Sequence, residues 1–144
     1  MQLIILRGLP GCGKSTYQRE HYQEAVVASA DFFFTKDEEY LFDPKKLGAA
    51  HQECFQTCLN ALQERAPFVV VDNTNLLAVD IAPYVLLGET FGYEVKILTL
   101  VADPKECKER NVHNVPYDTI CAMHSKMLRE NLPRRWNNRN VYKY

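Results

Sequence analysis

The sequence lacks the long features that mark several classes of protein. No apolar run among its 144 residues approaches the roughly 20 residues of a membrane-spanning helix, so we expect no membrane partner. The opening MQLIIL lacks the charged start of a signal peptide, so we expect no secretory leader. No run of five basic residues occurs and the formal net charge is −1, which disfavours a charge-driven grip on long nucleic acid. A nucleotide or a short strand end in a local basic pocket remains compatible with this composition.

A disulfide framework and a zinc-ligand pattern are also missing. The five cysteines are odd in number and scattered, so we expect a reducing, intracellular setting, cytoplasmic or nuclear. Cys54 and Cys58 lie one helical turn apart, and Cys121 precedes His124 by three positions. Structural zinc requires four ligands at closer spacing, so we interpret the cysteines as ordinary core or surface residues.

A glycine-rich stretch, RGLPGCGKST at residues 7–16, follows the first apolar run. Its glycines, lysine and serine have the P-loop spacing, in which backbone N–H groups surround phosphate oxygens. Lys14 can bridge the terminal phosphates of ATP, and the Ser15 hydroxyl can bind Mg²⁺. A chance glycine-rich turn is the alternative, but an apolar strand before it and a helix after it favour the P-loop. The predicted nucleotide-binding residues are Arg110 and, in the P-loop, Gly8, Pro10, Gly11, Cys12, Gly13, Lys14, Ser15 and Thr16.

Apolar strands alternate with helical patterns along the chain, which predicts an α/β protein with a mostly parallel central sheet of about four strands flanked by helices. The expected strands are residues 3–6, 25–29, 68–71 and 95–100. The expected helices are residues 14–22, 44–64, 78–91, 104–110 and 116–130, with proline at or near three of the starts. We expect one domain over residues 1–144 with a short helical lid near 103–116, and we assign no structure to the tail at 133–144.

The polar residues that follow the strands form a set suited to phosphoryl transfer. Ligands gather at the carboxyl ends of parallel strands, where we expect Asp31, Asp72 and Arg110 to surround the P-loop. Asp31 can receive the proton of an acceptor, Asp72 can hold the magnesium shell, and Arg110 can neutralise the transferring phosphoryl group. The alternatives are that Asp31 caps a turn, that the aromatic run 32–34 is core, and that Arg110 is a surface residue.

Four motifs in order resemble the polynucleotide 5′-hydroxyl kinase domain family of P-loop kinases: RGLPGCGKST, SADFFF, VVVDNTN and RNVHNVPYDTICAMHSKM. The pattern is similar to the bacteriophage polynucleotide kinase domain and to the kinase-like domain of animal ubiquitin-ligase-binding proteins. The resemblance covers the chain to about residue 133. It implies the P-loop NTPase/kinase fold, ATP and Mg²⁺ as cofactors, and transfer of the γ-phosphate to a 5′-hydroxyl. It implies that Asp31 is the general base and Arg110 the first arginine of the lid.

Three positions depart from the phage pattern, and all lie on the acceptor or lid side. Phe34 stands where the phage pattern has an arginine that grips the acceptor phosphate. Asn73 stands where it has an acidic residue, with Asp72 one place earlier. The second lid arginine is replaced by Asn114, with His113 beside it. Phe34, Asn73, Asn75 and His113 are therefore the candidate acceptor or lid contacts.

The sequence thus leaves three functions open. The leading one is an ATP-dependent kinase whose acceptor is the 5′-hydroxyl end of a polynucleotide or oligonucleotide. A P-loop kinase of a nucleoside or another small-molecule hydroxyl is the first alternative. A non-catalytic nucleotide-binding module on the same fold is the second.

Overall fold

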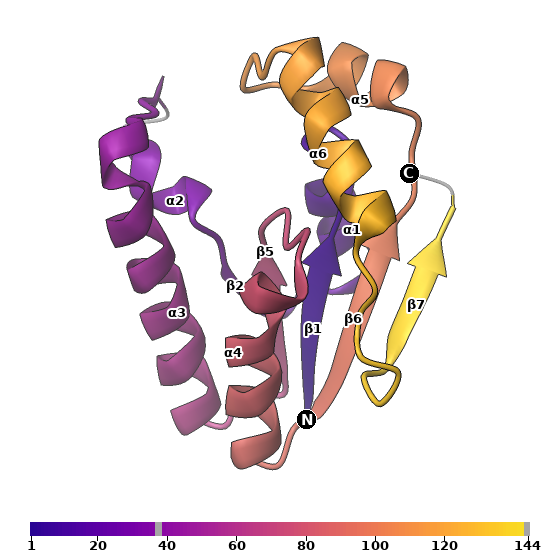
Figure 1. The fold of residues 1–144 in the computed structure, drawn as a ribbon. Coiled ribbons are helices and arrows are strands. Elements are labelled where there is room, and N and C mark those ends of the chain that lie inside the picture. Colours follow the sequence, from indigo (N-terminus) through magenta and orange to yellow (C-terminus); the bar gives the residue numbers. More distant parts are fainter. Residues whose placement is uncertain (37–38, 143–144) are drawn as a thin grey trace.

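The computed structural model describes residues 1–36 and 39–142, and a five-stranded sheet forms its centre (Figure 1). The strand order is β2-β5-β1-β6-β7, and every neighbouring pair is parallel. The strands are β1 (Gln2–Arg7), β2 (Val26–Ala28), β5 (Phe68–Asp72), β6 (Glu94–Leu100) and β7 (Asn138–Val141). The predicted α/β architecture with a parallel sheet is confirmed.

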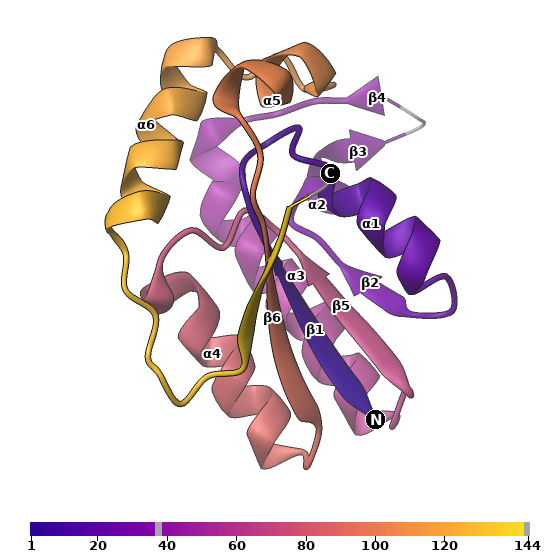
Figure 2. The same cartoon turned by 90° about the vertical axis from the view of Figure 1, so that its right-hand side faces the viewer.

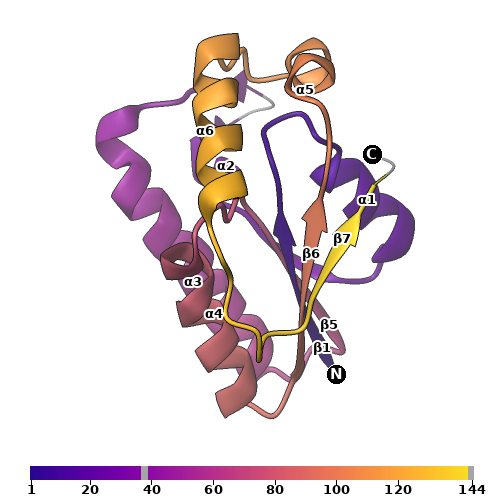
Figure 3. The same ribbon diagram turned by 45° about the vertical axis from the view of Figure 1, so that its right-hand side comes forward.

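The central strand β1 is buried on both faces, as its unbroken apolar sequence predicts. Leu3 and Ile5 point to one face and contribute to a core with helices α3 and α4. Ile4 and Leu6 point to the other face and contribute to a core with residues of α1, α5 and α6. Figure 3 shows α3 and α4 on one side of the sheet and α1 on the other. The sheet is therefore the middle layer of three.

The helices begin and end close to the predicted positions. They are α1 (Lys14–His21), α3 (Leu47–Gln63), α4 (Ala78–Thr90), α5 (Pro104–Arg110) and α6 (Tyr117–Arg129), with a 3-10 turn η1 (Pro44–Lys46) before α3. Asp103 caps α5 because its carboxylate accepts a hydrogen bond from the Lys105 N–H, and Pro104 fills the first turn. Asp43 caps η1 in the same way through the Lys45 N–H. Within the described residues no helix combines the length and apolar character needed to cross a membrane.

Three elements differ from the expectations. The central sheet has five strands rather than about four, because the tail contributes β7, which pairs with β6 from Ile97 to Leu100. Asp31 does not simply follow a strand, since it begins a four-residue helix α2 (Asp31–Phe34). A hairpin of β3 (Thr35–Lys36) and β4 (Glu39–Tyr40) follows. Figure 2 shows this hairpin and α5 at the end of the molecule toward which the parallel strands point.

Candidate active site

The P-loop folds at the carboxyl end of β1 and leads directly into α1. Gly11 and Gly13 adopt φ values of 82° and 102°, a left-handed region that favours glycine. The Lys14 ammonium donates hydrogen bonds to the carbonyl oxygens of Gly8 at 3.1 Å and Leu9 at 3.0 Å. The loop thus holds its positive charge at the N-terminal end of α1, where the helix dipole also favours an anion.

Helix α5, within the segment that we predicted to be a lid, packs directly on this loop. A methyl group at Gly11 would overlap the carbonyl oxygen of Cys107 and would lie 3.1 Å from the Asn111 N–H nitrogen. Cys12 and Cys107 are both fully buried in the same apolar core. Burial raises the pKa of the Cys12 thiol, and the nearby Lys14 lowers it by a smaller amount. Gly11 is therefore required both by its backbone angle and by the close approach of α5.

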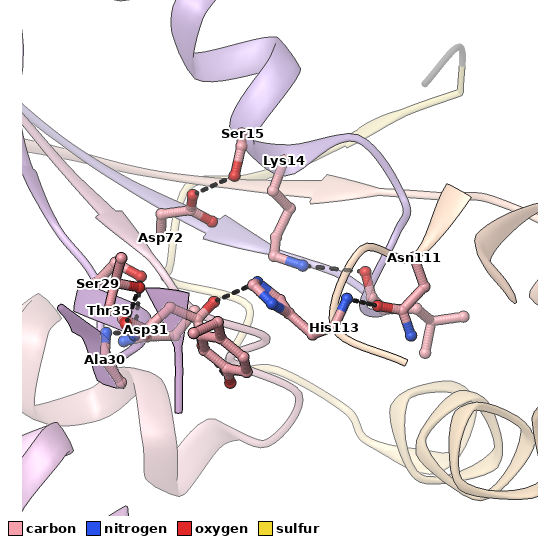
Figure 4. A network of polar contacts seen from close by, with 12 residues as sticks. Lys14, Ser15, Ser29, Ala30, Asp31, Thr35, Asp72, Asn111 and His113 are labelled. Carbon is pink, nitrogen blue, oxygen red and sulfur yellow. Dashed lines mark hydrogen bonds and ion pairs between the residues drawn. The ribbon is translucent and has the colours of Figure 1, made fainter. Parts of the chain in front are cut away.

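Ser15 and Asp72, which we predicted would hold Mg²⁺, are in direct contact with each other. The Ser15 hydroxyl donates to Asp72 Oδ2 at 3.0 Å across the first turn of α1 and the end of β5 (Figure 4). Desolvation raises the pKa of the Asp72 carboxyl, and the Lys14 charge and the Ser15 hydrogen bond oppose that rise. The hydroxyl and carboxylate are hard oxygen donors of the kind that Mg²⁺ prefers. No cluster of three His, Cys, Asp or Glu side chains that could hold a metal occurs in residues 1–36 and 39–142. Magnesium here would complete its shell with water and phosphate oxygens.

Asp31 lies on the same edge of the sheet with a half-exposed side chain. Its Oδ1 accepts a hydrogen bond from the Tyr40 hydroxyl at 3.3 Å. Its Oδ2 lies 3.7 Å from the Nε2 of His113 (Figure 4). The negative charge of Asp31 contributes to the raised pKa of Asp72, so the two carboxylates are electrostatic neighbours. A half-exposed carboxylate at this edge of the sheet is a group that can accept a proton.

The candidate acceptor contacts are mainly engaged inside the protein. Phe34 is 4% exposed and packs in a small apolar cluster with Ala30 and Ala50, so its ring is not presented to a ligand. Asn73 accepts from the Ala30 N–H at 2.9 Å and donates to Cys54 Sγ at 3.4 Å. Its amide thereby joins the loop after β5 to the residue before Asp31. For Phe34 this burial fits the alternative that the aromatic run 32–34 is core.

Asn75 is also a structural residue in this arrangement. It is 4% exposed and has a φ of 48°. Its Nδ2 donates to the Leu6 carbonyl at 2.7 Å, which connects the loop after β5 to β1 just before the P-loop. Its Nδ2 group is therefore bound to the backbone.

The lid residues divide into two groups. Arg110, at the end of α5, is 46% exposed, and its guanidinium lies 3.8 Å from the Glu106 carboxylate. Burial raises the pKa values of the Cys12 and Cys107 thiols, and the nearby Arg110 charge opposes that rise by a minor amount. His113 instead packs on the hairpin residue Tyr40, with the two ring centroids 3.9 Å apart. Arg110 therefore lies near the P-loop residue Cys12, whereas His113 lies beside the Asp31 carboxylate.

Arg7 is a residue whose role the sequence did not indicate. It is 5% exposed, and its Nη2 donates to the Leu76 carbonyl at 2.7 Å and to the Met127 carbonyl at 3.4 Å. Its Nε donates to the Asn75 and Leu76 carbonyls at 3.2 Å. Burial lowers the pKa of the guanidinium, and Glu130 partly opposes this. Arg7 therefore ties α6 and the loop after β5 to the base of the P-loop.

The comparison with known proteins follows from this geometry. Residues 3–136 match the sequence model of a family described as an AAA domain, AAA_33. The chain belongs to this family. The AAA_33 domain is 37% identical over 130 residues to the human NEDD4-binding protein 2, which confirms the resemblance that its motifs indicated. That match covers 84% of the chain but only 7% of the relative, so the chain spans a small part of that protein's length.

Two solved structures show the same fold as this AAA_33 domain. The first belongs to the Pnkp1/Rnl/Hen1 RNA repair complex, with a TM-score of 0.71, 19% identity, and coverage of 88% of this chain and 44% of the other. The second is a Chloroflexus aurantiacus protein assigned as a kinase, with a TM-score of 0.67, 18% identity, and coverage of 98% and 87%. The AAA_33 domain therefore has the P-loop kinase fold, and the predicted fold class is confirmed.

Proposed function

We propose that this domain is an ATP-dependent phosphotransferase that moves the γ-phosphate of ATP to the 5′-hydroxyl of a polynucleotide or oligonucleotide. The observation that carries the proposal is the half-exposed Asp31 carboxylate on the edge of the sheet that also holds the P-loop. A module that only bound nucleotide would have no need of a proton acceptor at this place. The motif resemblance supports a 5′-hydroxyl as the acceptor.

Each residue has a role that its position supports. Lys14 and the P-loop N–H groups hold the phosphates, and Ser15 and Asp72 hold magnesium, which neutralises charge on the β- and γ-oxygens when it is bound. Asp31 takes the proton of the acceptor hydroxyl as the new O–P bond forms and ADP leaves. Arg110, on the lid helix, turns from its exposed ion pair with Glu106 to the transferring phosphoryl group.

We also infer that the reaction takes place inside the cell. All five cysteines are free, and four of them are buried. Free thiols of this kind persist in the reducing cytoplasm or nucleus, where ATP is available.

A small-molecule hydroxyl, such as that of a nucleoside, is the second candidate acceptor. Phe34 favours it, because this buried ring occupies the position where the resembling phage pattern has a phosphate-gripping arginine. An acceptor without an adjacent phosphate would not need that cation.

Transfer of labelled γ-phosphate separates these functions. The acceptors are 5′-hydroxyl DNA and RNA oligonucleotides, the same oligonucleotides with a 5′-phosphate, and free nucleosides. We expect label on the 5′-hydroxyl oligonucleotides, none on the 5′-phosphorylated ones, and loss of transfer in Lys14→Ala. Label on nucleosides alone would favour the small-molecule kinase. ATP binding without transfer to any acceptor would contradict the kinase and favour the binding module.

A further inference from the structure

Tyr40 is the neighbour that holds Asp31 in place. It ends strand β4 of the short hairpin, and its hydroxyl donates to Asp31 Oδ1 at 3.3 Å. The phenol ring lies edge-on to the buried Phe34 ring at 6.3 Å and is stacked parallel to Phe42 at 6.4 Å. Because these rings fix the tyrosine, its hydroxyl gives Asp31 a defined hydrogen-bond partner that belongs to a different element.

The two carboxylate oxygens of Asp31 have different surroundings. Oδ1 accepts the Tyr40 hydroxyl, whereas Oδ2 faces the imidazole of His113 at 3.7 Å, beyond normal hydrogen-bond length. The imidazole in turn lies against the Tyr40 ring, with centroids 3.9 Å apart and planes tilted by 32°. Oδ2 is thus the oxygen that an incoming hydroxyl can reach, once the His113 ring has moved aside.

The Tyr40 hydroxyl keeps its proton over the whole physiological range. Burial, followed by the charge and the hydrogen bond of Asp31, raises the pKa of Tyr40 to about 12. Tyr40 therefore acts as a permanent donor to Oδ1 and does not compete with the acceptor to supply or take a proton.

We propose that Tyr40 is a positioning residue for the phosphoryl transfer, which holds Asp31 through Oδ1 so that Oδ2 meets the acceptor hydroxyl. This inference rests on the proposed function. In the step, the acceptor O–H bond breaks and its proton goes to Oδ2, while the acceptor oxygen bonds to the γ-phosphorus and ADP takes the electron pair of the broken P–O bond. Tyr40 keeps its own proton throughout. The hydroxyl of Tyr40, rather than its ring, is the group that matters.

Tyr40→Phe isolates that hydroxyl, because it retains the ring and its packing. We expect kcat to fall by about tenfold, the order expected for loss of one hydrogen bond to a charged group. The KM for ATP should stay within about twofold, since the hydroxyl that is removed bonds to Asp31 rather than to a P-loop residue. Tyr93→Phe is the matched control: it also loses one hydroxyl hydrogen bond, to the Ala66 carbonyl at 2.7 Å, but at the opposite end of the sheet. The melting temperature of each variant shows whether its fold is retained.

A double-mutant cycle with Asp31→Asn then tests whether Tyr40 acts through Asp31. Asp31→Asn alone should lower kcat by roughly a hundredfold to ten-thousandfold, as for loss of a general base. We expect Tyr40→Phe to have no further effect in that background under single-turnover conditions. Equal losses in both backgrounds, or no loss in wild type, would overturn the inference while the proposed function stands. A wild-type domain that transfers phosphate to no hydroxyl would overturn the proposed function and the inference together.

Discussion

Asp31 and Asp72 are both aspartates at the strand ends, but their surroundings give them different chemical properties. Asp72 accepts the Ser15 hydroxyl at the first turn of α1, and desolvation raises its pKa. Asp31 is half exposed and faces the lid and the hairpin. A carboxylate that is partly desolvated and next to the P-loop suits a metal, whereas an open carboxylate suits an incoming hydroxyl.

Asp72→Asn should therefore raise the stability of the fold and weaken the binding of Mg²⁺. The folded-state pKa of Asp72 lies above its unfolded value, so its contribution to stability is present below about pH 4 and is lost as pH rises through the folded pKa. Asparagine cannot ionise, so the variant avoids the loss of stability that wild type undergoes when Asp72 ionises. Without nucleotide, the variant should therefore melt at a higher temperature than wild type at pH 7. At pH 3.5 the two melting temperatures should be similar. Transfer should need more Mg²⁺.

A magnesium titration of the two asparagine variants is the check on these roles. Excess Mg²⁺ should recover part of the activity of Asp72→Asn and none of that of Asp31→Asn. Recovery of Asp31→Asn alone would mean that the roles of the two carboxylates are reversed.

The residues that the sequence did not indicate are those whose role depends on distant partners. Lys14, Ser15 and Asp31 could be predicted because local motifs identify them. Tyr40 contacts Asp31 because the β3–β4 hairpin folds back toward it. The sequence did not indicate this contact, since the aromatic residues before the hairpin are typical of a core segment. Arg7 meets Met127 across 120 positions of the chain, which no local pattern records.

At the scale of elements, the helices were more predictable than the short strands. Asp43-Pro44 and Asp103-Pro104 are local capping signals, and the carboxylate hydrogen bonds that they predict are present. Strand β7 has a polar sequence, NRNV, because it lies at the edge of the sheet with three of its four residues exposed. An edge strand of this kind has no apolar run by which the sequence could identify it.

Helix α5 packs against the P-loop, and its last residue, Arg110, is partly exposed. Gly11 packs on the backbone of α5, whereas Arg110 forms an exposed ion pair with Glu106, of a kind that contributes little to stability. Arg110→Ala should lower the melting temperature by less than about 4 °C, because an exposed pair of this kind contributes less than about 1 kcal/mol. It should lower kcat by about a hundredfold if its charge is felt mainly in the transition state.

Glu106→Gln is the matched control, since it breaks the same ion pair and leaves the arginine in place. We expect it to transfer phosphate at close to the wild-type rate. A change in ATP affinity without a change in kcat in Arg110→Ala would make Arg110 a ground-state binding residue instead.

At the scale of the whole molecule, the parallel sheet explains why separate motifs form one site. All five strands of the central sheet run in the same direction, so the segments after β1, β2, β5 and β6 meet at one edge. That rule could be applied before the structure was known, and it placed the P-loop, Asp31 and Asp72 together. The rule does not predict where the side chains lie within the site. The position of the Phe34 side chain depends on apolar packing, and that of Asn75 depends on a hydrogen bond to the backbone.

The P-loop also links nucleotide binding to the stability of the whole fold. Lys14 donates to the Gly8 and Leu9 carbonyls, and Arg7 ties the same strand end to α6 and the loop after β5. Mg²⁺ with a non-hydrolysable ATP analogue at about 100 times its Kd should therefore stabilise the domain by about 2.7 kcal/mol, which raises the melting temperature by roughly 5–10 °C. Lys14→Ala should lose most of this rise, because the charge next to the terminal phosphates is gone, whereas Tyr93→Phe should retain it. The measurement is a thermal melt with and without the analogue, and an equal rise in Lys14→Ala would show that the nucleotide binds elsewhere.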